Sequence, residues 1–316
     1  MNPQKSPRCL TNRSNTQKSS QAPFHAPTSY ALQNLKEGTL LCQHYAAYND
    51  PFEYWARIVE GVPDPEQEPE RFIAAARAWG FDVETIAEAR TKPSIWENFD
   101  EYFDECRCYA PPFDVMREGM RIACFGSEQD NLLLWSHYGD GLRGFCVVFD
   151  EHLITNSEFK GYLLDVSYLK SPPVVDSFVY GIAWDQDWYS QTAIQETNAR
   201  IKYQGKPELR AEIQMYEESG AGAIKTMRDI WQQVFATKPA EWSYERERRL
   251  LVQTDKSNNT PLLRSYPREA VRAVIVGEQM SEAYRAELLA MLEKKYAGVP
   301  VRTARRAQSA YALVIE

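Results

Sequence analysis

The sequence predicts an α+β fold: a single domain with a split antiparallel or mixed β-sheet core and helical insertions. Two observations support this. Short runs of β-branched and aromatic residues, bounded by turn-forming residues, are typical of strands. They alternate with longer stretches whose apolar residues recur at helical spacing. Because strands and helices interleave as far as the C-terminus, with no internal repeat or linker between them, we expect one α+β domain.

The expected helices are defined by apolar periodicity and by end signals. Thr28 or Ser29 can cap a helix over 30–37, which Gly38 ends. Longer helical stretches cover 72–108, 184–238 and 280–296, and the second of these is expected to break around 205–207 and 220–222. The expected strands cover 39–45, 120–125, 145–149, 161–168, 245–252, 270–277, 299–303 and 310–315.

Composition predicts how the chain is divided and in which compartment it is found. Residues 1–21 are polar and predict a disordered tail. Residues 22–316 form the expected domain, with helical insertions at about 60–118 and 184–238. A chain of 316 residues with 44% hydrophobic content can build a core, and a net charge of −8 argues against a dedicated nucleic-acid binder. No apolar run long enough for a membrane span and no secretory signal is seen, so we expect a cytoplasmic protein with reduced thiols.

The stretch from Asn131 to Asp150 is the most unusual in the chain. Its polar-tipped residues Trp135, Ser136, His137 and Tyr138 precede a glycine-rich turn and then a buried strand. Glycine lets a ligand approach the main chain closely. The aromatic rings beside the turn could stack on a base or nicotinamide of such a ligand. Arg143 in the turn could hold a pyrophosphate. Equally, the rings could belong to the core, His137 could bond a backbone carbonyl, and Arg143 could be a solvated turn residue.

Glu245 and Glu247 form a second candidate cluster. On a strand, residues two apart point to the same face, and two close carboxylates raise each other's pKa. Such a pair suits one proton-handling group beside one ionised group. The alternative is a solvated strand end in which these carboxylates pair with neighbouring arginines or with Lys238.

Four ordered segments resemble one family. They are Asn49–Glu53 (NDPFE), Leu134–Tyr138 with Gly144–Cys146 (LWSHY and GFC), Lys238 with Trp242–Arg249 (WSYERERR), and Ala273–Gly277 (AVIVG). Together they resemble the DUF2971 family of bacterial proteins of unknown function, over about Phe24 to the C-terminus. The usual opening strand of that family is replaced here by Phe24–His25.

A weaker resemblance concerns the opening strand, helix and second strand, which are similar to the start of ADP-ribosyltransferase-like domains. This resemblance implies a split-sheet enzyme that uses NAD as its substrate. It implies catalytic roles for His25, for Tyr138 and for Glu245 or Glu247, with Tyr45 as an alternative to Tyr138. The implied cofactor-binding residues are Trp135, Ser136, His137, Arg143, Tyr45 and Asn49. For Asn49 and Asp50, an Asx-Pro turn is the competing interpretation.

Three functions follow as hypotheses. The first is an ADP-ribosyltransferase that modifies a protein or nucleic acid, in bacterial defence or toxin biology. The second is a non-catalytic module that binds a nucleotide or peptide. The third, a nuclease or other hydrolase, ranks last because the sequence has no metal-binding motif such as H-E-x-x-H or paired CxxC.

Overall fold

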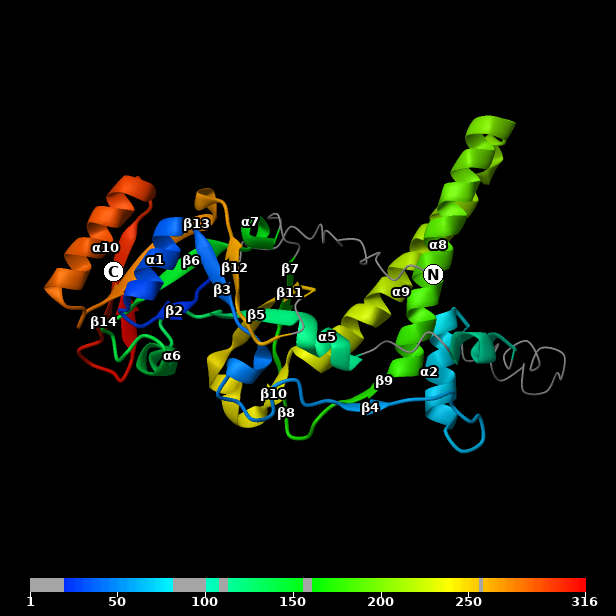
Figure 1. Cartoon of the computed structure of the whole chain (residues 1–316), viewed down its shortest axis with the longest axis horizontal. Helices are drawn as coiled ribbons and strands as arrows, with labels where there is room; N and C mark the ends of the chain where they lie inside the picture. Colours follow the sequence, from blue (N-terminus) through cyan, green and yellow to red (C-terminus); the bar gives the residue numbers. More distant parts are fainter. Residues whose placement is uncertain (1–19, 82–100, 108–112, 156–160, 256–257) are drawn as a thin grey trace. The chain divides into compact units, whose positions relative to one another are not determined.

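The computed structural model describes residues 20–81, 101–107, 113–155, 161–255 and 258–316 (Figure 1). The chain is a mixed α+β protein with several sheets, as predicted. Almost all of the expected N-terminal tail lies outside the described residues, and Ser20–Gln21 form a short strand, β1. Among the helices of the described ranges, none is both long and apolar enough to cross a bilayer.

Backbone contacts divide the chain into two compact units. Unit 1 comprises Met1–Glu53, Asp114–Tyr168 and Lys238–Glu316, and unit 2 comprises Tyr54–Phe113 and Leu169–Thr237. The chain passes from one unit to the other at four points: between Glu53 and Tyr54, at the start of α5 (Phe113–Gly119), and within β8 (Ser167–Leu169) and β10 (Thr237–Pro239).

The larger sheet of unit 1 is mixed. Its central strand β6 (Phe145–Asp150) pairs with β13 (Val271–Gly277) on one side, and with β1 and β2 (Phe24–His25) on the other. These pairings are antiparallel, whereas β13 and β14 (Val301–Arg306) are parallel. A parallel pair needs a crossover, which α10 (Glu282–Lys295) supplies. Strand β15 (Leu313–Ile315) forms the edge.

The smaller sheet of unit 1 is antiparallel and has the order β5-β11-β7. Its strands are Met120–Gly126, Glu247–Gln253 and Gly161–Asp165. A backbone bridge between Ala22 and Gly126 joins its edge to the first segment of the chain. A separate ladder pairs β3 (Thr39–Cys42) with β12 (Leu262–Ser265), so the strand predicted over 39–45 ends earlier than expected.

Helix α1 (Ser29–Glu37) confirms the predicted capping. The Thr28 hydroxyl accepts a hydrogen bond from the Ala31 amide at 3.1 Å, and Gly38 ends the helix in the left-handed conformation with φ 74°. Both end signals are local, which is why they can be identified in the sequence.

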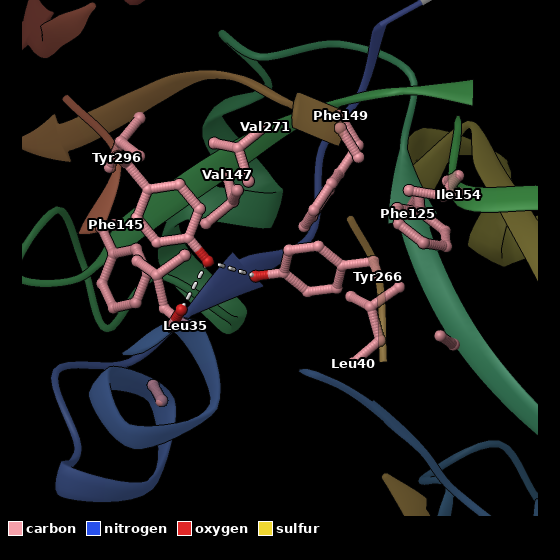
Figure 2. Packing of buried hydrophobic residues seen from close by; sticks show 14 of the residues in the cluster. Leu35, Leu40, Phe125, Phe145, Val147, Phe149, Ile154, Tyr266, Val271 and Tyr296 are labelled. Carbon is pink, nitrogen blue, oxygen red and sulfur yellow. Dashed lines mark hydrogen bonds between the residues drawn. The ribbon is translucent and has the colours of Figure 1, made fainter. Parts of the chain in front are cut away.

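The main core of unit 1 lies on one face of both sheets. Alternate residues of β6 (Phe145, Val147 and Phe149) and of β11 (Leu250 and Val252) belong to it. Figure 2 shows Tyr266 and Tyr296 within this cluster. The Tyr296 hydroxyl donates to the Leu35 carbonyl at 2.6 Å and lies 3.3 Å from the Tyr266 hydroxyl, which satisfies polar groups inside an apolar core (Figure 2).

A second cluster covers the other face of the larger sheet. Cys146 and Val148, which alternate with the first set along β6, pack there with the fully buried Trp135 of α6 (Leu132–His137). The predicted strand at 145–149 is therefore buried on both faces, which explains its continuous apolar sequence.

Unit 2 is mainly helical. It contains α2 (Pro69–Trp79), α8 (Ser177–Gln204) and α9 (Arg210–Phe235), together with a short parallel pair of β4 (Arg57–Val59) and β9 (Val174–Asp176). The predicted break near Gly205 is confirmed by a left-handed cap. The predicted break at 220–222 is wrong: Gly220 lies inside α9, where a Cβ would be 3.2 Å from the Ser190 Cβ of α8. Glycine there lets the two helices pack closely.

Candidate functional site

Asn131 caps the N-terminus of helix α6 and also connects the helix to a second element. Its side-chain oxygen accepts from the amides of Leu133 and Leu134 at 3.0 and 3.1 Å, which caps the helix. Its amide nitrogen donates to the Tyr244 carbonyl at 2.6 Å. Tyr244 lies in the 3₁₀ helix η4 (Ala240–Glu245). One side chain thus holds two motif segments together. Ser136 and His137 lie exposed on α6.

The glycine-rich turn after α6 serves the packing of the chain itself. A Cβ on Gly144 would lie 1.9 Å from the His25 carbonyl oxygen, and one on Gly277 would lie 2.0 Å from the Leu142 carbonyl oxygen. The close approach that glycine permits at Gly144 is therefore made by backbone of the same chain. The prediction that this turn leaves its main chain open to a ligand is wrong at this position.

Glu245 and Glu247 do not share a strand, contrary to the predicted geometry. Glu245 ends η4, Arg246 adopts the left-handed conformation with φ 42°, and Glu247 begins β11. The two carboxylates nevertheless meet at one cation. Lys238 Nζ lies 2.6 Å from Glu245 Oε2 and 2.6 Å from Glu247 Oε2.

The ion pairing continues beyond Lys238. Arg249 Nε donates to Glu247 Oε1 at 2.8 Å, and Arg249 Nη2 donates to Glu53 Oε2 at 2.9 Å. The side chains of all five residues are at most 4% exposed. We call Glu53, Arg249, Glu247, Lys238 and Glu245 the acidic network, because it contains three carboxylates and two cations. It joins the NDPFE segment to the WSYERERR segment.

The pKa values within the acidic network follow from burial and pairing. Burial raises the pKa of Glu247, but Arg249 and Lys238 outweigh it and lower this pKa to about 2. Burial opposes the charged form of Lys238, but Glu247 and Glu245 raise its pKa above the usual value. The pKa of Glu53 is raised, mainly by burial. For Glu247 the direction is opposite to the one predicted from two adjacent carboxylates, because cations separate the acids.

Tyr138 connects the acidic network to the surface. Its hydroxyl donates to Glu245 Oε1 at 2.7 Å, so the WSHY segment and the glutamate pair meet. The His137 and Tyr244 rings are 6.1 Å apart, as are the Trp242 and Tyr244 rings. Lys238 Nζ lies 5.3 Å from the centre of the Trp242 ring. We call His137, Tyr138, Trp242 and Tyr244 the aromatic surface.

His25 lies apart from this site. It pairs with Phe145 across two strands, and their rings are 5.1 Å apart. Phe145 faces the main core, and so do Leu250 and Val252 of β11. Glu247 and Arg249 alternate with those residues and face the other way. Burial lowers the pKa of His25 to about 4. The predicted convergence of His25 with Glu247 is therefore not found, because the two point to opposite sides.

The other candidate residues have separate partners. The Tyr45 hydroxyl donates to Glu118 at 2.8 Å, and Arg143 donates to the Asp140 carbonyl at 3.1 Å. Trp135 is buried, with Nε1 donating to the Gln129 carbonyl at 2.8 Å, which favours its interpretation as a core residue. Asn49 is exposed, and the next residue, Asp50, accepts from the Phe52 amide at 2.9 Å, as an Asx turn requires.

The sequence did not indicate a role for Glu53 beyond its place in the NDPFE motif. Lys238 and the neighbouring arginines were predicted only as alternative ion-pair partners of Glu245 and Glu247, and Lys238 and Arg249 have that role in the structure. Among the described residues, no group of three or more histidine, cysteine or acidic side chains could hold a metal ion.

Comparison with known proteins agrees with the motifs. Residues 134–250 match the model of the family described as "Protein of unknown function (DUF2971)". No curated protein and no solved structure matches the chain. The matched segment includes Tyr138, Lys238, Glu245, Glu247 and Arg249. Over residues 134–250, the chain is therefore similar to the DUF2971 family, as the motifs predict.

Proposed function

We propose that the chain is a non-catalytic peptide-binding module, whose aromatic surface and Glu245 bind a cationic side chain of the peptide. The observation that carries this proposal is the composition of the acidic network. Its three carboxylates exceed its two cations by one, and the chain of ion pairs ends at Glu245, beneath aromatic rings. A buried excess of negative charge favours a positive group at the nearest surface.

The aromatic rings support the same ligand. A cation over the face of a tryptophan or tyrosine ring is attracted by the ring quadrupole, most strongly when it is partly desolvated. The Trp242 ring already has the ammonium group of Lys238 nearby, while His137 is exposed and Tyr138 is 37% exposed. Trp242 and Tyr244 are half-buried, so His137 and Tyr138 are the more accessible rings of the aromatic surface.

A nucleotide fits less well because it needs cations for its phosphates. Lys238 and Arg249 are neutralised within the acidic network. At the nearby surface, Arg246 is paired with Glu128. Arg143 lies 3.9 Å from Asp140. A phosphate would therefore have to compete with a carboxylate for each of these cations.

The test is calorimetric titration of the full chain with a short peptide that carries one arginine. The control peptide carries citrulline, which has nearly the same shape and no charge. We expect the citrulline peptide to bind at least tenfold more weakly. Glu245→Gln should lose the preference for the charged peptide, whereas Glu241→Gln, an exposed carboxylate of the same 3₁₀ helix, should keep it. Equal binding of the two peptides would exclude the proposal.

A second function is favoured by the contact between Tyr138 and Glu245, because an ADP-ribosyltransferase-like site requires an aromatic hydroxyl near a carboxylate. In that function the two sheets act as a split-sheet core, NAD is the substrate, and a protein or nucleic acid is the acceptor, in bacterial defence or toxin biology. It ranks second because both carboxylates are buried and already ion-paired, Glu245 with Lys238 and Glu247 with Lys238 and Arg249. Its test is label transfer from NAD by the full chain, with Glu245→Gln and Glu241→Gln compared. Transfer that Glu245→Gln abolishes would favour it over peptide binding.

A further inference from the structure

The Glu245 carboxylate is covered by side chains of the chain itself. Its Oε1 accepts from the Tyr138 hydroxyl at 2.7 Å, and its Oε2 lies 2.6 Å from Lys238 Nζ. Its side chain is only 4% exposed. Each carboxylate oxygen has more than one lone pair, so burial, rather than a lack of acceptor positions, keeps a ligand from Glu245. One of the two side chains that cover the carboxylate must move aside before a cationic ligand can reach it.

Only one of those donors can leave without exposing a buried charge. Lys238 is 4% exposed at its side chain and is held by a second carboxylate, Glu247. Withdrawing it would leave two buried acids with less compensation, which is strongly unfavourable. Tyr138 is neutral and 37% exposed, and it lies at the C-terminal end of α6. Its hydroxyl can instead bond to water.

We infer that Tyr138 is a gate: its hydroxyl occupies the position on Glu245 that the ligand's N–H donor takes when it binds. This inference rests on the proposed function and adds the residue that controls access to the site. In the free protein, the tyrosine satisfies a buried carboxylate oxygen that would otherwise lack a donor. In the complex, the ligand supplies that donor, and the displaced ring remains beside the cation.

If Tyr138 were an ordinary contact residue, removing its hydroxyl would weaken peptide binding. The gate predicts that removing it strengthens binding. Tyr138→Phe keeps the ring and removes the competing hydroxyl, so the arginine peptide should bind about tenfold more tightly or better, because a hydrogen bond to a charged group no longer has to be broken. Tyr168→Phe is the matched control. The Tyr168 hydroxyl accepts from the Glu247 amide at 2.8 Å, so it lies beside the acidic network without bonding to Glu245.

The experiment measures peptide affinity for the wild-type chain, Tyr138→Phe, Tyr168→Phe, and Tyr138→Phe combined with Glu245→Gln. The gate requires a gain in the first variant, no gain in the second and no gain in the double variant. If the wild type binds the arginine peptide and Tyr138→Phe binds it equally or more weakly, with an unchanged melting temperature, the gate is refuted and the proposed function stands. If neither the wild type nor Tyr138→Phe prefers arginine to citrulline, the proposed function fails and the gate with it.

Discussion

Replacing Lys238 by methionine should destabilise unit 1 strongly. Lys238 Nζ is 2.6 Å from a carboxylate oxygen of both Glu245 and Glu247, and its side chain is 4% exposed. Removing one partner from a buried ion pair typically costs about 3–5 kcal/mol, because an uncompensated charge remains in the interior. Methionine has a similar length, so the loss reports the missing charge rather than a cavity.

The lowered pKa of Glu247 reflects the same ion pairing, to which Arg249 contributes first and Lys238 second. Its fall from an ordinary 4.5 to about 2 corresponds to roughly 3 kcal/mol of native-state stabilisation. Because this pKa is lowered, the contribution is present above about pH 4.5 and is lost as the pH falls towards 2. In Lys238→Met the pKa of Glu247 should rise, because one of the two cations that lower it is removed. A raised native pKa favours the native state at low pH. The loss in free energy of unfolding of Lys238→Met relative to the wild type should therefore be smaller at pH 5 than at pH 7.

Urea unfolding of both proteins at pH 7 and pH 5 measures this. Lys36→Met is the control, because Lys36 is an exposed lysine of the same unit, and its loss should cost no more than about 0.5 kcal/mol. The reasoning would be refuted if Lys238→Met lost less than about 1 kcal/mol in free energy of unfolding at pH 7, or lost equally much at both pH values.

Three further changes test how the site and the core are held. Asn131→Ala removes the cap of α6 and the bond to the Tyr244 carbonyl. It should lower the free energy of unfolding by about 1–2 kcal/mol and weaken arginine-peptide binding, and unchanged binding would show that η4 holds its position without this bond. Gly144→Ala would place a Cβ 1.9 Å from the His25 carbonyl oxygen, so a loss of roughly 3 kcal/mol or more is expected in urea unfolding; a loss below 1 kcal/mol would mean that β2 can shift away. Tyr296→Phe removes one of two donors to the Leu35 carbonyl, which keeps the Gly38 amide at 3.2 Å, and should cost about 1 kcal/mol in thermal or urea unfolding; a neutral result would indicate that the Gly38 amide alone satisfies this carbonyl.

The sequence by itself determined the elements that depend on neighbouring residues. Thr28 and Gly38 mark the ends of α1, and the apolar run at 145–149 is a buried strand, because capping and burial on both faces leave short-range patterns. The motif segments also located most members of the site. Local patterns failed at Gly220, where the cost of glycine inside a helix is offset by close contact with a second helix.

Only the tertiary structure decided how those segments meet. Glu53, Tyr138 and Glu245 are far apart in the chain, and nothing in their spacing shows that Arg249 and Lys238 separate the carboxylates or that Tyr138 covers one of them. His25 and Glu247 both carry suitable chemistry, yet strand alternation directs His25 towards the main core and Glu247 away from it. Periodicity fixes the direction of a side chain relative to its own element, whereas charge pairing depends on distance through space, which only the packed sheets set.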